Sequence, residues 1–140
     1  MPLFEPYAIS LWGILVIIVT MMVQALIAMN IKASQPGAVP GKIDPNLSHS
    51  SFVFRTHRTF MNSLENTPIM LATSFLAILT GANIFWSGLL IWIYAISRIM
   101  HMVLYYVIAT EKNPSPRSIF FMTAFIANVV LSGFIATSLH

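Results

Sequence analysis

The stretch from residue 58 to residue 68, R-T-F-M-N-S-L-E-N-T-P, contains a guanidinium, an amide and a carboxylate at helical spacing. Arg58, Asn62 and Glu65 are four and then three residues apart, so they share one face of a helix. The chain then continues as IMLATSFLAIL, which is apolar enough for lipid. Charged side chains inside a membrane segment indicate a functional site, because their burial is costly. We therefore interpret this face as part of a binding site.

A second polar face occurs in the third apolar segment, where Arg98, His101 and Tyr105 follow the same helical spacing. At a rise of about 1.5 Å per residue, Glu65 and Arg98 lie at depths that agree within about one turn. An ion pair between them would offset part of the cost of placing each charge in the membrane. We therefore expect a Glu65–Arg98 ion pair.

The start of the last apolar segment forms a third wall of this site. Ser115 is the expected N-cap, and Pro116 suits the first helical position. Free backbone N–H groups there, with the positive end of the helix dipole, favour an anion. Arg117 and Ser118 follow at once and strengthen that preference.

Each of these residues also has a simpler interpretation. Arg55 is as consistent with a side chain that reaches the membrane interface as with a site residue. His101 taken alone is typical of a satisfied interior histidine, and Asn62 could simply join two helices by a hydrogen bond. The combination of polar faces at matching depths favours a functional site, whose ligand should be small, zwitterionic and on balance negative.

The amino-acid composition indicates which structural elements hold these polar residues in place. The 140-residue chain is 57% apolar and 8% charged, against about 25% charged in soluble domains. Four segments, at about residues 7–31, 52–79, 84–108 and 116–138, approach the roughly 20 residues that cross a bilayer. We predict an all-α membrane protein, a single four-helix up-down transmembrane bundle over residues 1–140. Because so small a bundle has little interior of its own, we expect several copies of the chain in a homo-oligomer to line the polar cavity together.

Charge distribution predicts the orientation. Lysine and arginine cluster in or beside the first and third connections, which places loops 32–51 and 109–115 in the cytoplasm and both termini on the opposite side. The net charge of +3 comes without a recognition motif, so no nucleic-acid partner is expected. The absence of cysteine excludes disulfides and thiolate metal sites, and we expect no metal site.

The motifs R-x-x-x-N-x-x-E, R-x-x-H-x-x-x-Y and S-P-R-S, in this order, resemble a family of membrane-associated proteins in eicosanoid and glutathione metabolism, the MAPEG family. The likeness is to its microsomal glutathione transferases, and it covers nearly the whole chain. It implies a homotrimer that binds glutathione between subunits near the cytoplasmic side. By position it implies catalytic roles for Arg117 and Ser118 near the sulfur. The glutathione-binding residues that it implies are Arg58, Asn62, Glu65, Arg98, His101, Tyr105 and Lys32.

Departures from the family pattern reduce the range of activities that the resemblance implies for this chain. Met61 stands where the prostaglandin synthase branch has an arginine, and Phe121 stands where that branch has a tyrosine. Lys32 replaces the arginines common at the end of the first helix. These differences disfavour prostaglandin synthesis.

The function that the resemblance implies is that of a membrane-bound glutathione transferase, with glutathione peroxidase activity as a further expectation. Its partners would be a hydrophobic electrophile or a lipid hydroperoxide dissolved in the bilayer. Two alternatives remain: a non-catalytic scaffold of the same family that binds lipid or glutathione, and a small ion or proton conductor using Glu65 and His101. The nearly dry far halves of the helices disfavour the conductor.

Overall fold

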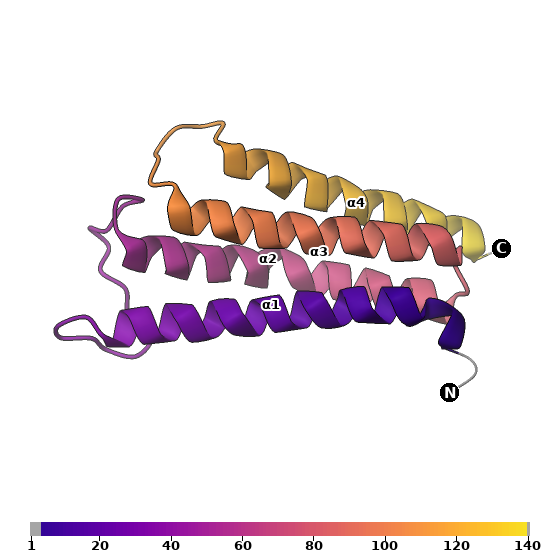
Figure 1. Ribbon diagram of the computed structural model, residues 1–140, viewed down its shortest axis with the longest axis horizontal. Coiled ribbons are helices and arrows are strands. Elements are labelled where there is room, and N and C mark those ends of the chain that lie inside the picture. The colour runs from indigo at the N-terminus through magenta and orange to yellow at the C-terminus, as the bar shows by residue number, and fades with distance from the viewer. Residues whose placement is uncertain (1–3, 140) are drawn as a thin grey trace.

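The computed structural model of the chain describes residues 4–139, in which no strand occurs. A short 3-10 turn, η1 (Glu5–Tyr7), leads into the helices α1 (Ala8–Ala33), α2 (Phe52–Leu79), α3 (Ile84–Val107) and α4 (Pro116–Ser138). The helices run alternately up and down, with α2 and α3 between α1 and α4 (Figure 1). The four expected helices are therefore present, with bounds within two residues of those expected.

Side chains next to the connections explain where the central helices begin. The Ser51 hydroxyl accepts a hydrogen bond from the N–H of Phe54 at 3.4 Å and caps α2. Asn83 caps α3 by accepting from the N–H of Trp86 at 3.1 Å. Between α2 and α3, Gly81 has φ of +68°, a conformation that side chains disfavour, which permits the tight turn.

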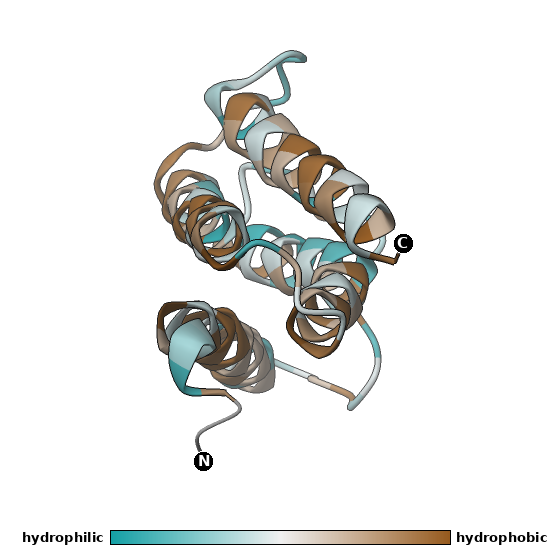
Figure 2. Ribbon diagram, turned by 90° about the vertical axis from the view of Figure 1, so that its right-hand side faces the viewer, coloured by the Kyte–Doolittle hydropathy of each residue, from teal (hydrophilic) through white to brown (hydrophobic). Residues whose placement is uncertain are grey.

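Within the described residues, three helical segments are long and apolar enough to cross a membrane: Glu5–Ala33, Ile84–Val107 and Pro116–Ser138. The fourth expected segment, α2, does not meet this measure of length and composition. The first half of α2 carries Arg55, Arg58 and Glu65 together with many hydroxyl residues, which lower its hydropathy. Seen along the bundle, hydrophobic residues recur on all four helices (Figure 2).

The helices pack through a narrow apolar core and leave large apolar side chains outside. Met70, Ile91 and Leu131 are fully buried. Trp12 is 64% exposed and Val129 is 55% exposed, on α1 and α4 respectively. Apolar surface of this extent on outward helix faces suits contact with lipid or another subunit.

A stripe of small hydroxyl residues on α2 faces the interior, made up of Thr56, Thr59, Ser63, Thr67 and Ser74. Several of these hydroxyls donate hydrogen bonds to backbone carbonyls of their own helix. The Thr59 hydroxyl donates to the carbonyl of Arg55 at 2.7 Å, and the Ser74 hydroxyl donates to that of Met70 at 2.7 Å. This face therefore allows close helix packing without leaving most of its hydroxyls unpaired.

Candidate functional site

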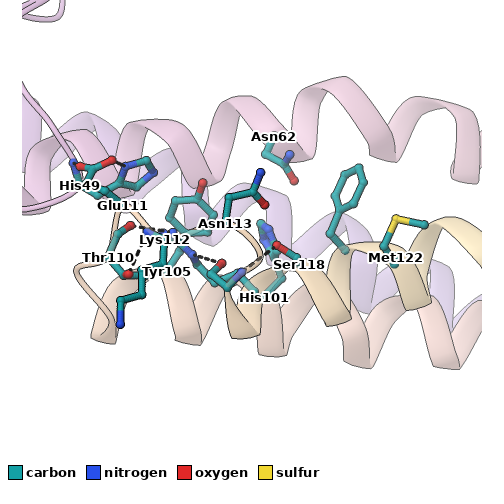
Figure 3. Close-up of a pocket in the computed structure, with 13 residues that line it drawn as sticks. His49, Asn62, His101, Tyr105, Thr110, Glu111, Lys112, Asn113, Ser118 and Met122 are labelled. Carbon is teal, nitrogen blue, oxygen red and sulfur yellow. Dashed lines mark hydrogen bonds and ion pairs between the residues drawn. The ribbon is translucent and has the colours of Figure 1, made fainter.

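A cavity of about 400 Å³ opens at the end of the bundle that carries the two long connections. It lies between α2, α3, α4 and the segment that joins α3 to α4 (Figure 3). This volume falls in the range of small-molecule sites. Five of the residues expected in the site line it: Asn62, His101, Tyr105, Arg117 and Ser118.

Arg117 is the most restrained cation of this cavity, and only 6% of it is exposed. Its guanidinium lies over the ring of Tyr105 at 4.1 Å, within cation–π range. Nε donates to the Ser115 hydroxyl at 3.2 Å, and Nη2 donates to the carbonyl of Thr110 at 3.0 Å. Nη1 is buried without a partner among residues 4–139. The site thus contains a fixed positive charge with one unused donor.

Ser118 lies one turn into α4 and belongs to the cap of that helix. Ser115 is the N-cap residue, as expected. The N–H of Ser115 donates to the Ser118 hydroxyl at 3.3 Å, and the N–H of Ser118 donates to the carbonyl of Ser115 at 2.9 Å. The hydroxyl proton of Ser118 is not used in this cap, so it is available as a donor.

Three rings line the inner wall of the cavity. The rings of His101 and Tyr105 are 5.0 Å apart, and those of His101 and Phe121 are 6.5 Å apart. His101 is 3% exposed, and its Nδ1 is buried without a partner in the described part of the chain. Phe121 presents a hydrocarbon ring, so it offers this site no phenol donor.

His49 and Glu111 join the two long connections at the mouth of the cavity. Glu111 accepts from the backbone N–H of His49 at 2.8 Å, and its other oxygen lies 2.7 Å from Nδ1 of the His49 ring. Hydrogen bonds from the His49 side chain and then from its backbone hold the pKa of Glu111 below its usual 4.5. This contact, which we call the loop clasp, places a carboxylate among the cavity's cations.

Arg55 supports the same connection. It donates to the carbonyls of His49 and Ser50 at 2.7 and 2.9 Å, and to that of Tyr106 on α3 at 3.4 Å. Arg55 therefore positions a loop, which differs from both roles that the sequence left open for it.

The expected Glu65–Arg98 ion pair is wrong for the single chain. Arg98 is 3% exposed, and its Nη2 donates to the Asn62 amide oxygen at 2.7 Å and to the Ser63 hydroxyl at 3.0 Å. Glu65 pairs instead with Arg58 at 3.4 Å. Successive residues of a helix are about 100° apart, so Asn62 and Ser63 flank the direction of α3 while Glu65 lies beyond Asn62. Equal depth of Glu65 and Arg98 along their helices therefore does not determine how α2 is rotated about its axis towards α3.

The structure does not bring the remaining expected residues into the cavity. The side chains of Arg58 and Glu65 are 42% and 52% exposed on the outer face of α2. Lys32 lines a separate groove of about 510 Å³ formed by the end of α1 and the loop that follows it. Since α1 and α4 lie on opposite sides of α2 and α3, this groove is remote from Arg117 (Figure 1).

Sequence reasoning missed four residues near the site. His49 and Glu111 lie in loops, where no helical spacing could reveal them. Ser63 was overlooked beside Asn62 because a serine in a membrane helix is common. Asn128 stands alone in an apolar stretch of α4, a signal that was present in the sequence.

Within residues 4–139, no group of three or more histidine or acidic side chains is arranged to hold a metal ion.

Comparison with known proteins gives one informative result. A sequence profile described as the MAPEG family matches residues 9–137. A search of the curated proteins finds no match.

Proposed function

Because this chain belongs to the MAPEG family, of membrane proteins associated with eicosanoid and glutathione metabolism, we propose that it is a glutathione-dependent transferase that also reduces lipid hydroperoxides. The observation that carries the proposal is the 400 Å³ cavity in which Arg117, Ser118, His101, Tyr105 and Asn62 meet. These residues come from three helices and include the two proposed to act on the sulfur.

The donor set of the cavity fits glutathione, a tripeptide thiol with two carboxylates and one ammonium group. Arg117 Nη1 and the Ser118 hydroxyl are unused donors for negative groups. Asn62 and Glu111 also line the cavity and provide oxygen acceptors that would hold an ammonium group. When bound, glutathione supplies a thiol whose deprotonated form is a nucleophile.

Arg117 would stabilise negative charge at the sulfur. A free thiol has a pKa of about 8.5, and each unit by which a cation lowers it represents about 1.4 kcal/mol. A drop of about two units raises the thiolate fraction at most roughly thirtyfold, and the lower basicity takes back part of this gain. Positioning therefore contributes more, since the cavity holds a water-soluble reactant where an apolar electrophile dissolved in lipid can meet it.

A homotrimer would complete the site. Arg58 and Glu65 face outward on α2, and Lys32 lies on α1, which α2 and α3 separate from α4, so one chain alone cannot direct all three at the cavity. A neighbouring subunit packed against α2 would let Arg58 and Glu65 bind glutathione at the interface and supply Lys32 from its own α1. In that assembly α2 would be the fourth span, with its polar half covered by protein rather than lipid.

The cavity end would face the cytoplasm. It carries Lys32, Lys42 and Lys112, together with Arg55 at the start of α2, and cytoplasmic ends of membrane proteins are enriched in such residues. Cytoplasmic exposure would give the site access to glutathione, while the apolar outer faces of the helices give access to lipid.

One observation favours a scaffold that binds glutathione without turnover. Arg117 is already held by Thr110, Ser115 and the Tyr105 ring, as a residue with a structural role would be. Phe121 also lacks the hydroxyl that the family's prostaglandin synthase branch places there. A scaffold would bind glutathione but leave a nitroaryl halide and a hydroperoxide unchanged.

Titration of glutathione and of S-methylglutathione into purified protein in detergent tests the proposal. We expect both to bind, and we expect Arg117→Ala to weaken glutathione roughly tenfold or more, since a hydrogen bond to a charged group contributes about 1.5–3 kcal/mol. The loss should be smaller for S-methylglutathione, which has no thiolate. Turnover of a nitroaryl halide or a hydroperoxide should fall with it.

Lys42→Ala is the matched control, because it removes a cation from the same end of the protein but from outside the cavity. It should leave both affinities unchanged. Absence of glutathione binding by the unmodified protein would refute the proposal, and binding without turnover of either substrate would favour the scaffold.

A further inference from the structure

A second, smaller cavity lies deeper in the bundle than the first. Its volume is about 50 Å³, and it is enclosed by side chains of α2, α3 and α4, namely Asn66, Ile69, Tyr94, Arg98, Phe121, Ala124, Phe125 and Asn128. Phe121 lines both cavities. The small cavity thus adjoins the proposed glutathione site at this residue.

Two side chains that line this small cavity each carry a buried polar atom that has no hydrogen-bond partner among residues 4–139. Arg98 Nε is a buried donor, on a side chain that is 3% exposed. Asn128 Oδ1 is a buried acceptor, on a residue that is 9% exposed. Buried polar groups in proteins are nearly always paired, and an unpaired group next to a charge is especially costly. A donor and an acceptor left unpaired on two side chains that line the same cavity suggest a polar occupant that bonds to both.

Water fits this cavity in size and in chemistry. A water molecule occupies about 30 Å³ in the liquid, so 50 Å³ has room for about one or two. Water accepts from Arg98 Nε and donates to Asn128 Oδ1, which a bare anion cannot do. We propose that the small cavity is a permanent hydration site in which water bridges Arg98 and Asn128, and that Asn128 is thereby a positioning residue for the larger cavity.

The positioning role follows from the bonds on the other side of Arg98. Its Nη2 donates to Asn62 Oδ1 at 2.7 Å, and Asn62 lines the larger cavity. Water that fixes Nε therefore fixes the guanidinium plane, which in turn orients the amide of Asn62 toward a ligand. This part rests on the proposed function, whereas the hydration of the small cavity does not.

A crystal structure at about 2 Å resolution or better tests the hydration site directly. We expect about one or two water peaks within roughly 2.7–3.2 Å of Arg98 Nε and Asn128 Oδ1, and we expect them to be lost in Asn128→Leu. Crystals soaked in bromide should show no anomalous peak there. An empty cavity, or a bromide peak beside Arg98, would overturn the proposal.

Glutathione titration tests the positioning role. We expect Asn128→Leu to weaken binding about threefold to tenfold, and Asn128→Asp, which keeps an acceptor oxygen, to restore most of the affinity. Ser132→Ala is the control, because Ser132 lies one turn further along α4 and its hydroxyl bonds only to the backbone carbonyl of Asn128. Its affinity should equal that of the unmodified protein.

A double-mutant cycle separates positioning from a general structural effect. If Asn128 acts through Asn62, Asn128→Leu should change affinity little in an Asn62→Ala background. Losses that simply multiply would overturn the positioning role while leaving the water result intact. If the unmodified protein binds no glutathione, the proposed function and the positioning role both fail, and the crystal structure alone decides the hydration site.

Discussion

Arg117 is held by contacts from α3, from the connection between α3 and α4, and from the cap of α4. Its guanidinium stacks on Tyr105 of α3, and two of its nitrogens bond to Thr110 in the loop and Ser115 at the helix cap. These contacts fix where the charge lies before any ligand arrives, and preorganised charge is more effective than charge that must move. The Tyr105 ring, rather than its hydroxyl, makes this contact.

Substitutions of Tyr105 should therefore separate ring from hydroxyl. Tyr105→Phe should keep thermal stability within about 0.5 kcal/mol of the unmodified protein, because the face of the ring remains over Arg117. Tyr105→Leu should lower stability by about 1–2 kcal/mol, through the loss of the cation–π contact and of aromatic packing. Unfolding in detergent followed by circular dichroism measures both. Equal losses in the two variants would show that the hydroxyl matters instead.

At the residue scale the sequence predicted which side chains form the site better than it predicted their partners. Asn62, His101, Tyr105, Arg117 and Ser118 were expected together and line one cavity. Glu65 was assigned to Arg98, but Ser63, next to Asn62, took that place. Spacing along a helix gives relative rotation, whereas the rotation of the whole helix against its neighbour depends on packing that spacing alone does not contain.

Helices α1 and α3 approach closely at Gly13. A Cβ atom built there would lie 2.7 Å from Cγ2 of Ile91, a fully buried, β-branched side chain that cannot move easily. Gly133 on α4 provides a contrast, since a Cβ there would meet nothing within 4 Å. Close helix packing therefore requires glycine at position 13 but not at position 133.

Alanine substitution should expose that difference. Gly13→Ala should destabilise the protein by about 1–3 kcal/mol, because the added methyl group overpacks the α1–α3 contact. Gly133→Ala, as its matched control, should be neutral or stabilise by up to about 1 kcal/mol, because alanine favours the helix more than glycine does. Thermal unfolding of both variants provides the comparison. A neutral Gly13→Ala would mean that α1 is less tightly packed than the structure shows.

At the scale of the element, the sequence predicted the helices because their apolar runs are long and because Ser115 and Pro116 mark the start of the last one. The prediction of a fourth apolar span rested on the segment IMLATSFLAIL, whereas the half of α2 before it is polar. That half is where Asn62 and Ser63 bind Arg98, so the least apolar helix is the one that holds the charge of its neighbour.

At the scale of the whole molecule, the loop clasp ties the connection before α2 to the connection after α3. Glu111 and His49 are 62 residues apart in the chain, so the contact links two otherwise separate loops at the mouth of the large cavity. No pattern in either loop predicts it, because loop residues lack the periodicity that places helical side chains.

The clasp makes stability depend on pH through Glu111. Its pKa is lowered in the folded protein by the hydrogen bonds from His49, so the stabilisation is present above the usual value of 4.5 and is lost as the pH falls through the lowered value. At neutral pH, Glu111→Gln should therefore melt below the unmodified protein, and the difference should vanish as the pH falls below the lowered pKa of Glu111. Differential scanning calorimetry across this range measures it.

Asp44→Asn is the control for that experiment. It removes the same charge from the first long loop, but the Asp44 carboxylate bonds only to Asn46 beside it, at 2.9 and 3.0 Å. A melting difference for Glu111→Gln that stays constant with pH, or one that Asp44→Asn reproduces, would argue against the clasp.

The up-and-down course of the helices has a practical consequence. Phe4 and Leu139 lie at the same end of the bundle, the one remote from both long loops (Figure 1). If all four helices cross the membrane as proposed, a fluorescent or affinity partner fused beyond either residue would sample one and the same compartment, at the end of the bundle away from the large cavity. Conversely, a probe inserted between Pro36 and Pro45 would lie on the other side of the bundle and give the opposite reading of sidedness.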